Sequence, residues 1–226
     1  MKRFLLSLLL LFLFLLPVEA ANRFAFCTTA CTWDATNQTM WGTASGGVGV
    51  PASVPGSSDA VIFDAATCAA GTTCTITIST APTIQSFTWG ACTASTTGCI
   101  IDNSANNNFT ITTATGFNGS GIGTRTFIGG SGTYTMSATS GTPWTMTTTT
   151  NLSNPTAAFA NATVVLTGSA SGVAIIFSGG TMTYGTVSYL ANSGISVFGT
   201  MTIATLNVTG PNAIFLPGGV TTAITN

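Results

Sequence analysis

Residues 180–189 read GTMTYGTVSY and residues 199–208 read GTMTIATLNV, so the same ten-residue pattern returns after 19 residues. A third copy begins at residue 218 with GGVTTAI. Each copy alternates threonine with larger apolar residues and is bounded by glycine or asparagine, which is typical of one coil of a β-solenoid. A single coil cannot bury its own inward face, so we expect the coils to stack and share a core.

The rest of the chain shows the same alternation in a looser form. Short runs such as TITI at 75–78, FTIT at 109–112 and TYTM at 133–136 place apolar side chains on one face of a strand and hydroxyls on the other. Segments rich in glycine, serine and asparagine separate these runs. We therefore predict an all-β fold, a right-handed parallel β-helix (β-solenoid) with an N-terminal capping segment. A β-sandwich is the alternative, because short strands at this spacing fit one as well.

The N-terminus has the pattern of a secretory signal peptide. Lys2 and Arg3 precede an apolar run over 4–16, and a V-x-A sequence ends at Ala20. The run is shorter than the ~20 residues that a membrane-spanning helix needs, and no second such run follows. We predict a signal peptide at 1–20, a cap segment at 21–60 and a β-solenoid at 61–226, and hence a secreted or cell-surface protein with no membrane span in the mature chain.

The near-absence of charge excludes most chemistry. Charged residues make up 4% of the chain, and histidine is absent. The charged residues after residue 20 are Arg23, Arg125, Asp34, Asp59, Asp64 and Asp102. Nucleic-acid binding needs clustered cations, and the Ser–His–Asp and Cys–His nucleophile systems need histidine. We therefore expect a non-enzymatic protein with no catalytic residues, no cofactor and no nucleic-acid partner.

Paired carboxylates are the remaining route to hydrolysis. Asp59 and Asp64 bracket the short run AVIF, and an ideal strand would send them to opposite faces. We expect both residues to belong to turns and strand ends instead.

All six cysteines lie in the first half of the mature chain. They are Cys27, Cys31, Cys68, Cys74, Cys92 and Cys99. An even number in an exported protein predicts disulfides, whose connectivity the sequence alone leaves open. The spacing favours three local pairs, Cys27–Cys31, Cys68–Cys74 and Cys92–Cys99. A metal site is the alternative, but without histidine or a Cys-x-x-Cys motif we predict none.

Three further segments occur in a recognisable order. They are WDATNQTMW at 33–41, VPGSSDAVIFD at 54–64 and TRTFIGGSGTYT at 124–135. With them, the chain resembles repetitive parallel β-helix surface proteins of bacteria and phages, akin to autotransporter passenger domains and filamentous-haemagglutinin-like adhesins. The resemblance implies a right-handed β-helix whose cap is formed by residues 21–60, and it implies no catalytic residues.

The function expected from these features is that of a surface adhesive or structural element. The alternatives are a phage or filament structural subunit, and an ice-binding or carbohydrate-binding protein. The last copy of the repeat stops partway, so we expect a longer natural chain or end-to-end association with another solenoid chain. A glycan or host surface is a further expected partner.

Two sets of residues bear on the alternatives. Sugar rings could stack on Trp33, Trp41, Trp89 and Trp144, although core packing explains these residues as well. Ice binding would use T-x-T pairs, which begin at Thr75, Thr110, Thr124, Thr133, Thr145, Thr181 and Thr200. Only the last two pairs lie one repeat apart, so the sequence does not establish a single regular face.

Overall fold

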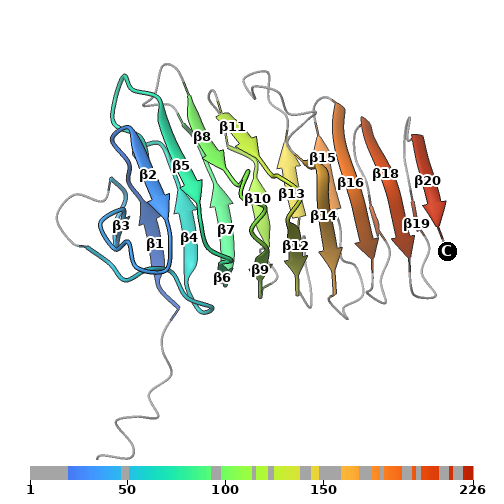
Figure 1. Ribbon diagram of the computed structural model, residues 1–226, viewed down its shortest axis with the longest axis horizontal. Coiled ribbons are helices and arrows are strands. Elements are labelled where there is room, and N and C mark those ends of the chain that lie inside the picture. Colours follow the sequence, from blue (N-terminus) through green and yellow to red (C-terminus); the bar gives the residue numbers. More distant parts are fainter. Residues whose placement is uncertain are drawn as a thin grey trace, which may run out of the picture.

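The computed structural model describes residues 20–46, 51–92, 98–113, 116–121, 125–137, 144–147, 159–167, 175–178, 181–189, 195–196, 200–208, 214–215 and 221–225. All regular secondary structure in these ranges is β-strand. The strands lie side by side along one long axis, from β1 to β20 (Figure 1). Parallel pairing joins one coil to the next, so the fold is a β-solenoid, as predicted, and not a β-sandwich. The predicted signal peptide lies outside the described residues, apart from Ala20.

Sheet 1 runs along one side of the solenoid. Its strands are β1 (Asn22–Ala25), β3 (Trp41–Gly42), β4 (Ala60–Phe63), β7 (Ser86–Trp89), β10 (Phe117–Gly119), β13 (Trp144–Thr147) and β15 (Ile175–Ser178). Their spatial order is β15-β13-β10-β7-β4-β1-β3, and every neighbouring pair is parallel except β1 and β3. The segment 21–60 thus contributes a parallel strand to this sheet as well as the antiparallel strand at its end.

Sheet 2 is shorter and contains the cysteine-bearing strands. Its strands are β2 (Ala30–Trp33), β5 (Cys74–Ile78), β8 (Cys99–Asp102) and β11 (Arg125–Ile128). All three pairings are parallel. Side chains alternate between buried and partly exposed along β5, as the period of two requires.

Sheet 3 extends to the C-terminal end of the described chain. Its strands are β6 (Thr83–Ile84), β9 (Phe109–Ile111), β12 (Thr133–Met136), β14 (Phe159–Leu166), β16 (Thr181–Tyr189), β18 (Thr200–Val208) and β20 (Thr221–Thr225). A separate parallel pair is formed by β17 (Ile195–Ser196) and β19 (Ile214–Phe215). The seven strands of sheet 3 pair in parallel throughout.

The predicted 19-residue repeat holds only at the C-terminal end. There Thr181 pairs with Thr200 and Thr202 with Thr221. Nearer the N-terminus Ile76 pairs with Ile101, which makes the coil longer than 19 residues. The N-terminal coils carry longer connections between strands of otherwise similar pattern, which explains why no fixed period is visible there.

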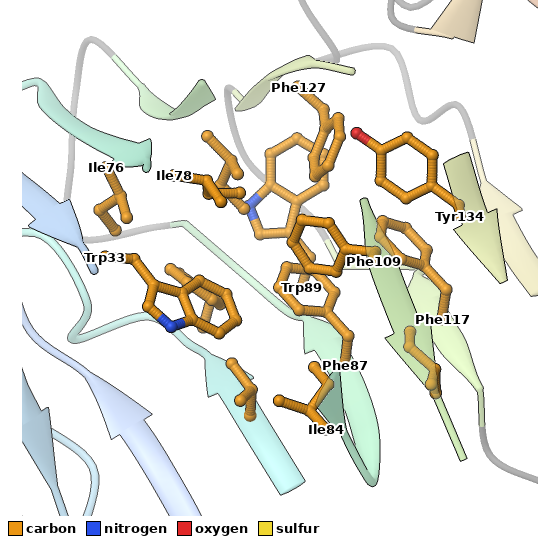
Figure 2. Close-up of a cluster of buried hydrophobic side chains, with 14 of the residues drawn as sticks. Trp33, Ile76, Ile78, Ile84, Phe87, Trp89, Phe109, Phe117, Phe127 and Tyr134 are labelled. Atoms are coloured by element: carbon orange, nitrogen blue, oxygen red, sulfur yellow. The ribbon is translucent and has the colours of Figure 1, made fainter. Parts of the chain in front are cut away.

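Aromatic rings form the centre of the core (Figure 2). The ring of Phe117 stacks on that of Phe87 at 4.8 Å and on that of Trp144 at 4.5 Å, with interplanar angles of 17° in both pairs. In-register parallel strands about 4.8 Å apart produce such stacks, because each inward side chain lies above the matching one of the previous coil. Aromatic pairs contribute about 0.5–1.5 kcal/mol each beyond the area they bury.

An ion pair joins the first strand, β1, to the turn before β4. Arg23 Nε lies 3.4 Å from Asp59 Oδ2, and Arg23 also donates a hydrogen bond to Ser53 Oγ. The Asp59 carboxylate accepts further hydrogen bonds from the backbone amides of Ala21 and Gly56. The turn before β4 is thereby tied to the start of β1.

Candidate functional site

The six cysteines form the three predicted local disulfides. The pairs are Cys27–Cys31, Cys68–Cys74 and Cys92–Cys99. Cys68 Sγ lies 2.9 Å from Cys99 Sγ, so two of the disulfides contact each other in the core. The sulfur atoms of Cys68, Cys74 and Cys99 lie within 4.8 Å of one another. A soft metal binds cysteine as the thiolate, and disulfide-bonded sulfur atoms are not thiolates. We therefore interpret this cluster as a pair of neighbouring structural disulfides.

The four tryptophans do not form a sugar-stacking surface. Their exposed fractions are 0% for Trp33 and Trp144 and 1% for Trp41 and Trp89. Trp33 and Trp41 pack edge to face at 5.0 Å, and Trp144 Nε1 donates a hydrogen bond to the Tyr184 hydroxyl. Each tryptophan lies at the end of a strand with its ring directed into the core, where burial of the large apolar ring stabilises the fold. The expectation of ligand-stacking tryptophans is therefore corrected to core packing.

The four aspartates serve turns and the ion pair described above. Asp34 Oδ1 accepts hydrogen bonds from the backbone amides of Thr36 and Asn37, which hold the pKa of the Asp34 carboxyl below its ordinary value. Asp64 accepts from the backbone amide of Ala66, and Asp102 accepts from that of Ser104. These contacts are the turn chemistry expected of aspartate beside a strand.

Arg125 is a buried cation that the sequence pattern does not reveal. Its side chain is 0% exposed and points inward from β11, in register with Cys99 of the previous coil. The guanidinium donates hydrogen bonds to the carbonyls of Trp89 and Gly119, and its carbon lies 4.6 Å from the centre of the Trp89 ring. Burial lowers the pKa of Arg125 to about 10, so the group stays charged at neutral pH. Its contacts connect the strands β7, β10 and β11.

Asn103 forms a second buried polar centre, at the turn after β8. The two hydrogens of its amide NH2 group are donated to the Asn107 carbonyl and the Tyr134 hydroxyl, and the Gly129 carbonyl shares one of them at a longer distance of 3.3 Å. Its amide oxygen accepts a hydrogen bond from the Asn107 backbone amide. Asn103 therefore replaces the backbone partners that the turn cannot provide for itself.

The described part of the chain also contains a small cavity of about 270 Å³ beside β6. It is lined by Trp33, Ala35, Val54, Pro55, Thr80, Ala81, Pro82 and Thr83. None of these side chains is charged, and so the cavity presents no acid, base or cation to a ligand.

The outer face of sheet 3 carries two rows of side chains that continue from strand to strand. Row 1 consists of Thr133, Thr163, Thr186 and Thr205, which pair in register. Row 2 consists of Thr83, Thr110, Thr135, Val165, Ser188 and Asn207, which also pair in register. All of these side chains are partly or fully exposed. The residues between the rows, such as Tyr134, Val164 and Val187, point into the core and fix the strands from behind.

The hydroxyls of row 1 have no partner in the part of the chain that the structure describes. Within the described residues, the hydroxyls of Thr133, Thr163, Thr186 and Thr205 make no hydrogen bond, and the same is true of Thr110 and Thr135 in row 2. By contrast, Asn207 donates a hydrogen bond to Ser188 Oγ at 3.2 Å. None of the charged residues after residue 20 lies on a strand of sheet 3.

The T-x-T pairs considered for ice binding fall on all three sheets. Thr75 belongs to sheet 2 and Thr145 to sheet 1, whereas Thr110, Thr133, Thr181 and Thr200 belong to sheet 3; Thr124 lies outside the described residues. The pairs that begin at Thr181 and Thr200 lie in register on β16 and β18, as their spacing of one repeat indicated. Rows 1 and 2 lie beside them and combine members of T-x-T pairs, such as Thr133 and Thr135, with threonines that have no T-x-T partner, such as Thr163. The sequence therefore indicated the stacked pair but not rows 1 and 2.

No known protein family, curated protein or solved structure matches the chain. Among the described residues, no helix has the length and apolar character needed to cross a membrane. The outer face of sheet 3 carries the two in-register rows described above, and we take it as the candidate functional site.

Proposed function

We propose that this protein is a secreted, non-enzymatic β-solenoid that acts as a surface adhesive or structural element and makes contact through the outer face of sheet 3. The observation that carries the proposal is the pair of in-register rows on that face, which are uncharged and rich in threonine. A long regular face of this kind suits contact with another extended surface better than capture of a small molecule, because small-molecule sites are concave.

Three features support the rest of the proposal. The signal-peptide pattern and the three disulfides fit an exported protein in an oxidising environment. Histidine is absent from the sequence, and the four aspartates accept hydrogen bonds in turns or form an ion pair, which supports a non-enzymatic role.

The experiment measures attachment of the mature chain, residues 21–226, to solid surfaces such as crystalline cellulose, chitin and intact cells. Thr163→Tyr and Thr186→Tyr place bulky rings in the middle of row 1. Thr126→Tyr is the matched control, since Thr126 is partly exposed on the outer face of sheet 2. We expect saturable attachment to at least one surface, which both row 1 variants lose and the control keeps.

Equal attachment of the row 1 variants and the control would show that sheet 3 is not the contact surface. A second copy of the chain is the alternative partner for this face. Light scattering on the same samples tests whether the chain forms such a dimer. Loss of a dimer in the row 1 variants, without any attachment to solids, would assign the face to self-assembly.

A further inference from the structure

We propose that the surface recognised by the outer face of sheet 3 is ice, bound through rows 1 and 2 as a two-dimensional array. The inference rests on the proposed function, because it names the ligand of the same face. It is carried by the spacing of the rows, by the unused hydroxyls and by the absence of charge.

The spacing repeats in two directions. Successive members of a row lie on hydrogen-bonded parallel strands, which are about 4.8 Å apart. Rows 1 and 2 are two residues apart along each strand, as Thr133 and Thr135 show, which corresponds to roughly 6.6 Å. Both distances are comparable to the repeat distances of oxygen atoms on faces of hexagonal ice. A flexible soluble glycan offers no lattice of this kind.

The chemistry of the array also suits a water lattice. Each threonine offers one methyl group and one hydroxyl, and the hydroxyls of Thr110, Thr133, Thr135, Thr163 and Thr186 have no partner within the described residues. β-Branched side chains have restricted χ1 rotation, so the array is stiff before it binds. Stiffness reduces the conformational entropy lost on binding, which matters where each contact is weak.

The absence of charge favours ice over the other candidates. A charged side chain would order water around itself instead of accepting the positions of a neutral lattice, and sheet 3 carries none. Recognition of a polysaccharide would draw on exposed aromatic rings, but the four tryptophans and the tyrosines Tyr134 and Tyr184 are buried. The face therefore offers hydroxyls and methyl groups without a stacking platform.

The array is most regular in its middle. Row 1 is all threonine from Thr133 to Thr205, whereas row 2 changes to Val165, Ser188 and Asn207 on the later strands. The hydrogen bond from Asn207 to Ser188 further removes two polar groups from the array. Substitutions at Thr163 and Thr186 should therefore have the largest effect.

The experiment is slow growth of ice from a solution of the mature chain, with the protein concentration measured in the ice and in the remaining liquid. Thermal hysteresis of the same samples is the second readout. We expect the mature chain to be enriched in the ice relative to an inert protein, and Thr163→Tyr and Thr186→Tyr to fall to the inert level. Thr126→Tyr on sheet 2 should remain enriched, and circular dichroism verifies that each variant is folded.

Exclusion of the folded mature chain from ice, to the same extent as the inert protein, would overturn the inference. If ice excludes the chain but the row 1 variants lose attachment to cellulose, chitin or cells, the ligand is wrong and the contact surface stands. If neither ice nor any solid surface distinguishes the row 1 variants from Thr126→Tyr, both the ligand and the proposed function are wrong.

Discussion

The buried pair of Asn103 and Tyr134 gives a quantitative test of how the coils hold each other. Asn103 belongs to the turn after β8, and Tyr134 lies on β12 of the following coil. The Tyr134 hydroxyl accepts a hydrogen bond from Asn103 at 2.8 Å and donates one to the Gly129 carbonyl at 2.7 Å. Tyr134→Phe removes both bonds but keeps the ring stacked on Phe109, whereas Asn103→Ala removes every hydrogen bond that its side chain makes.

The magnitudes follow from the number of bonds lost. Each intramolecular hydrogen bond contributes about 1 kcal/mol net, so Tyr134→Phe should lower the free energy of unfolding by about 2 kcal/mol. Asn103→Ala removes the two N–H hydrogens, which are shared among three acceptors, and one accepted bond, and should therefore cost about 3 kcal/mol. The two residues share one of these bonds, so the double variant should cost about 1 kcal/mol less than the sum of the single variants.

The assay is urea denaturation of residues 21–226. Tryptophan fluorescence serves as the readout, because the indole rings lie in the same core. Ser104→Ala is the control, since Ser104 lies in the same turn but is exposed and should change stability by less than about 0.5 kcal/mol. Additive effects of the two substitutions would refute the direct bond between Asn103 and Tyr134. A cost of Asn103→Ala no larger than that of Ser104→Ala would refute the whole network.

Three further predictions concern backbone conformation, alkaline pH and the disulfides. Gly130 and Gly71 both have positive φ, so alanine at either position should lower the free energy of unfolding by roughly 1–2 kcal/mol. Gly130→Ala should lower the melting temperature further than Gly71→Ala, because the new Cβ at position 130 meets a backbone carbonyl of the neighbouring coil. Equal shifts of the melting temperature would contradict that close approach. Burial raises the pKa of Tyr184 well above its ordinary value, so on raising the pH the unfolded chain loses this proton before the folded chain does. The free energy of unfolding should therefore fall above a pH of about 10, and it should fall less steeply in Tyr184→Phe. Urea midpoints measured as a function of pH test this. Removing the Cys68–Cys74 disulfide by double alanine substitution should lower the free energy of unfolding by about 2 kcal/mol. Peptide mapping of the unsubstituted chain without reductant should find Cys68 bonded to Cys74 and to no other cysteine.

Local sequence patterns were sufficient to predict the fold class and the disulfides. Alternation of threonine with apolar residues defines strands without any long-range information, and the repeat at 180–208 shows that such strands stack. The disulfide Cys68–Cys74 closes a turn between neighbouring elements, so its spacing in the sequence reflects its spacing in the fold.

The grouping of the outward threonines could not be predicted, because it depends on the length of each coil. Thr133 meets Thr163 and Thr163 meets Thr186, and the sequence separation differs between these two pairs. A search for T-x-T at a fixed period therefore misses row 1. The same limitation hid the burial of Arg125, since no local pattern indicates that the carbonyls of Trp89 and Gly119 converge on its position.

Parallel in-register stacking has a consequence for how this protein can change in evolution. The distance between neighbouring coils is set by backbone hydrogen bonds and is independent of the connections, which vary in length along the chain. Duplication of the segment that carries one coil, such as residues 180–198, would lengthen the molecule and add one more residue to each row, with the same distance between neighbouring coils. Total binding strength to a large surface could thus be adjusted by gene duplication alone, without redesign of any single contact.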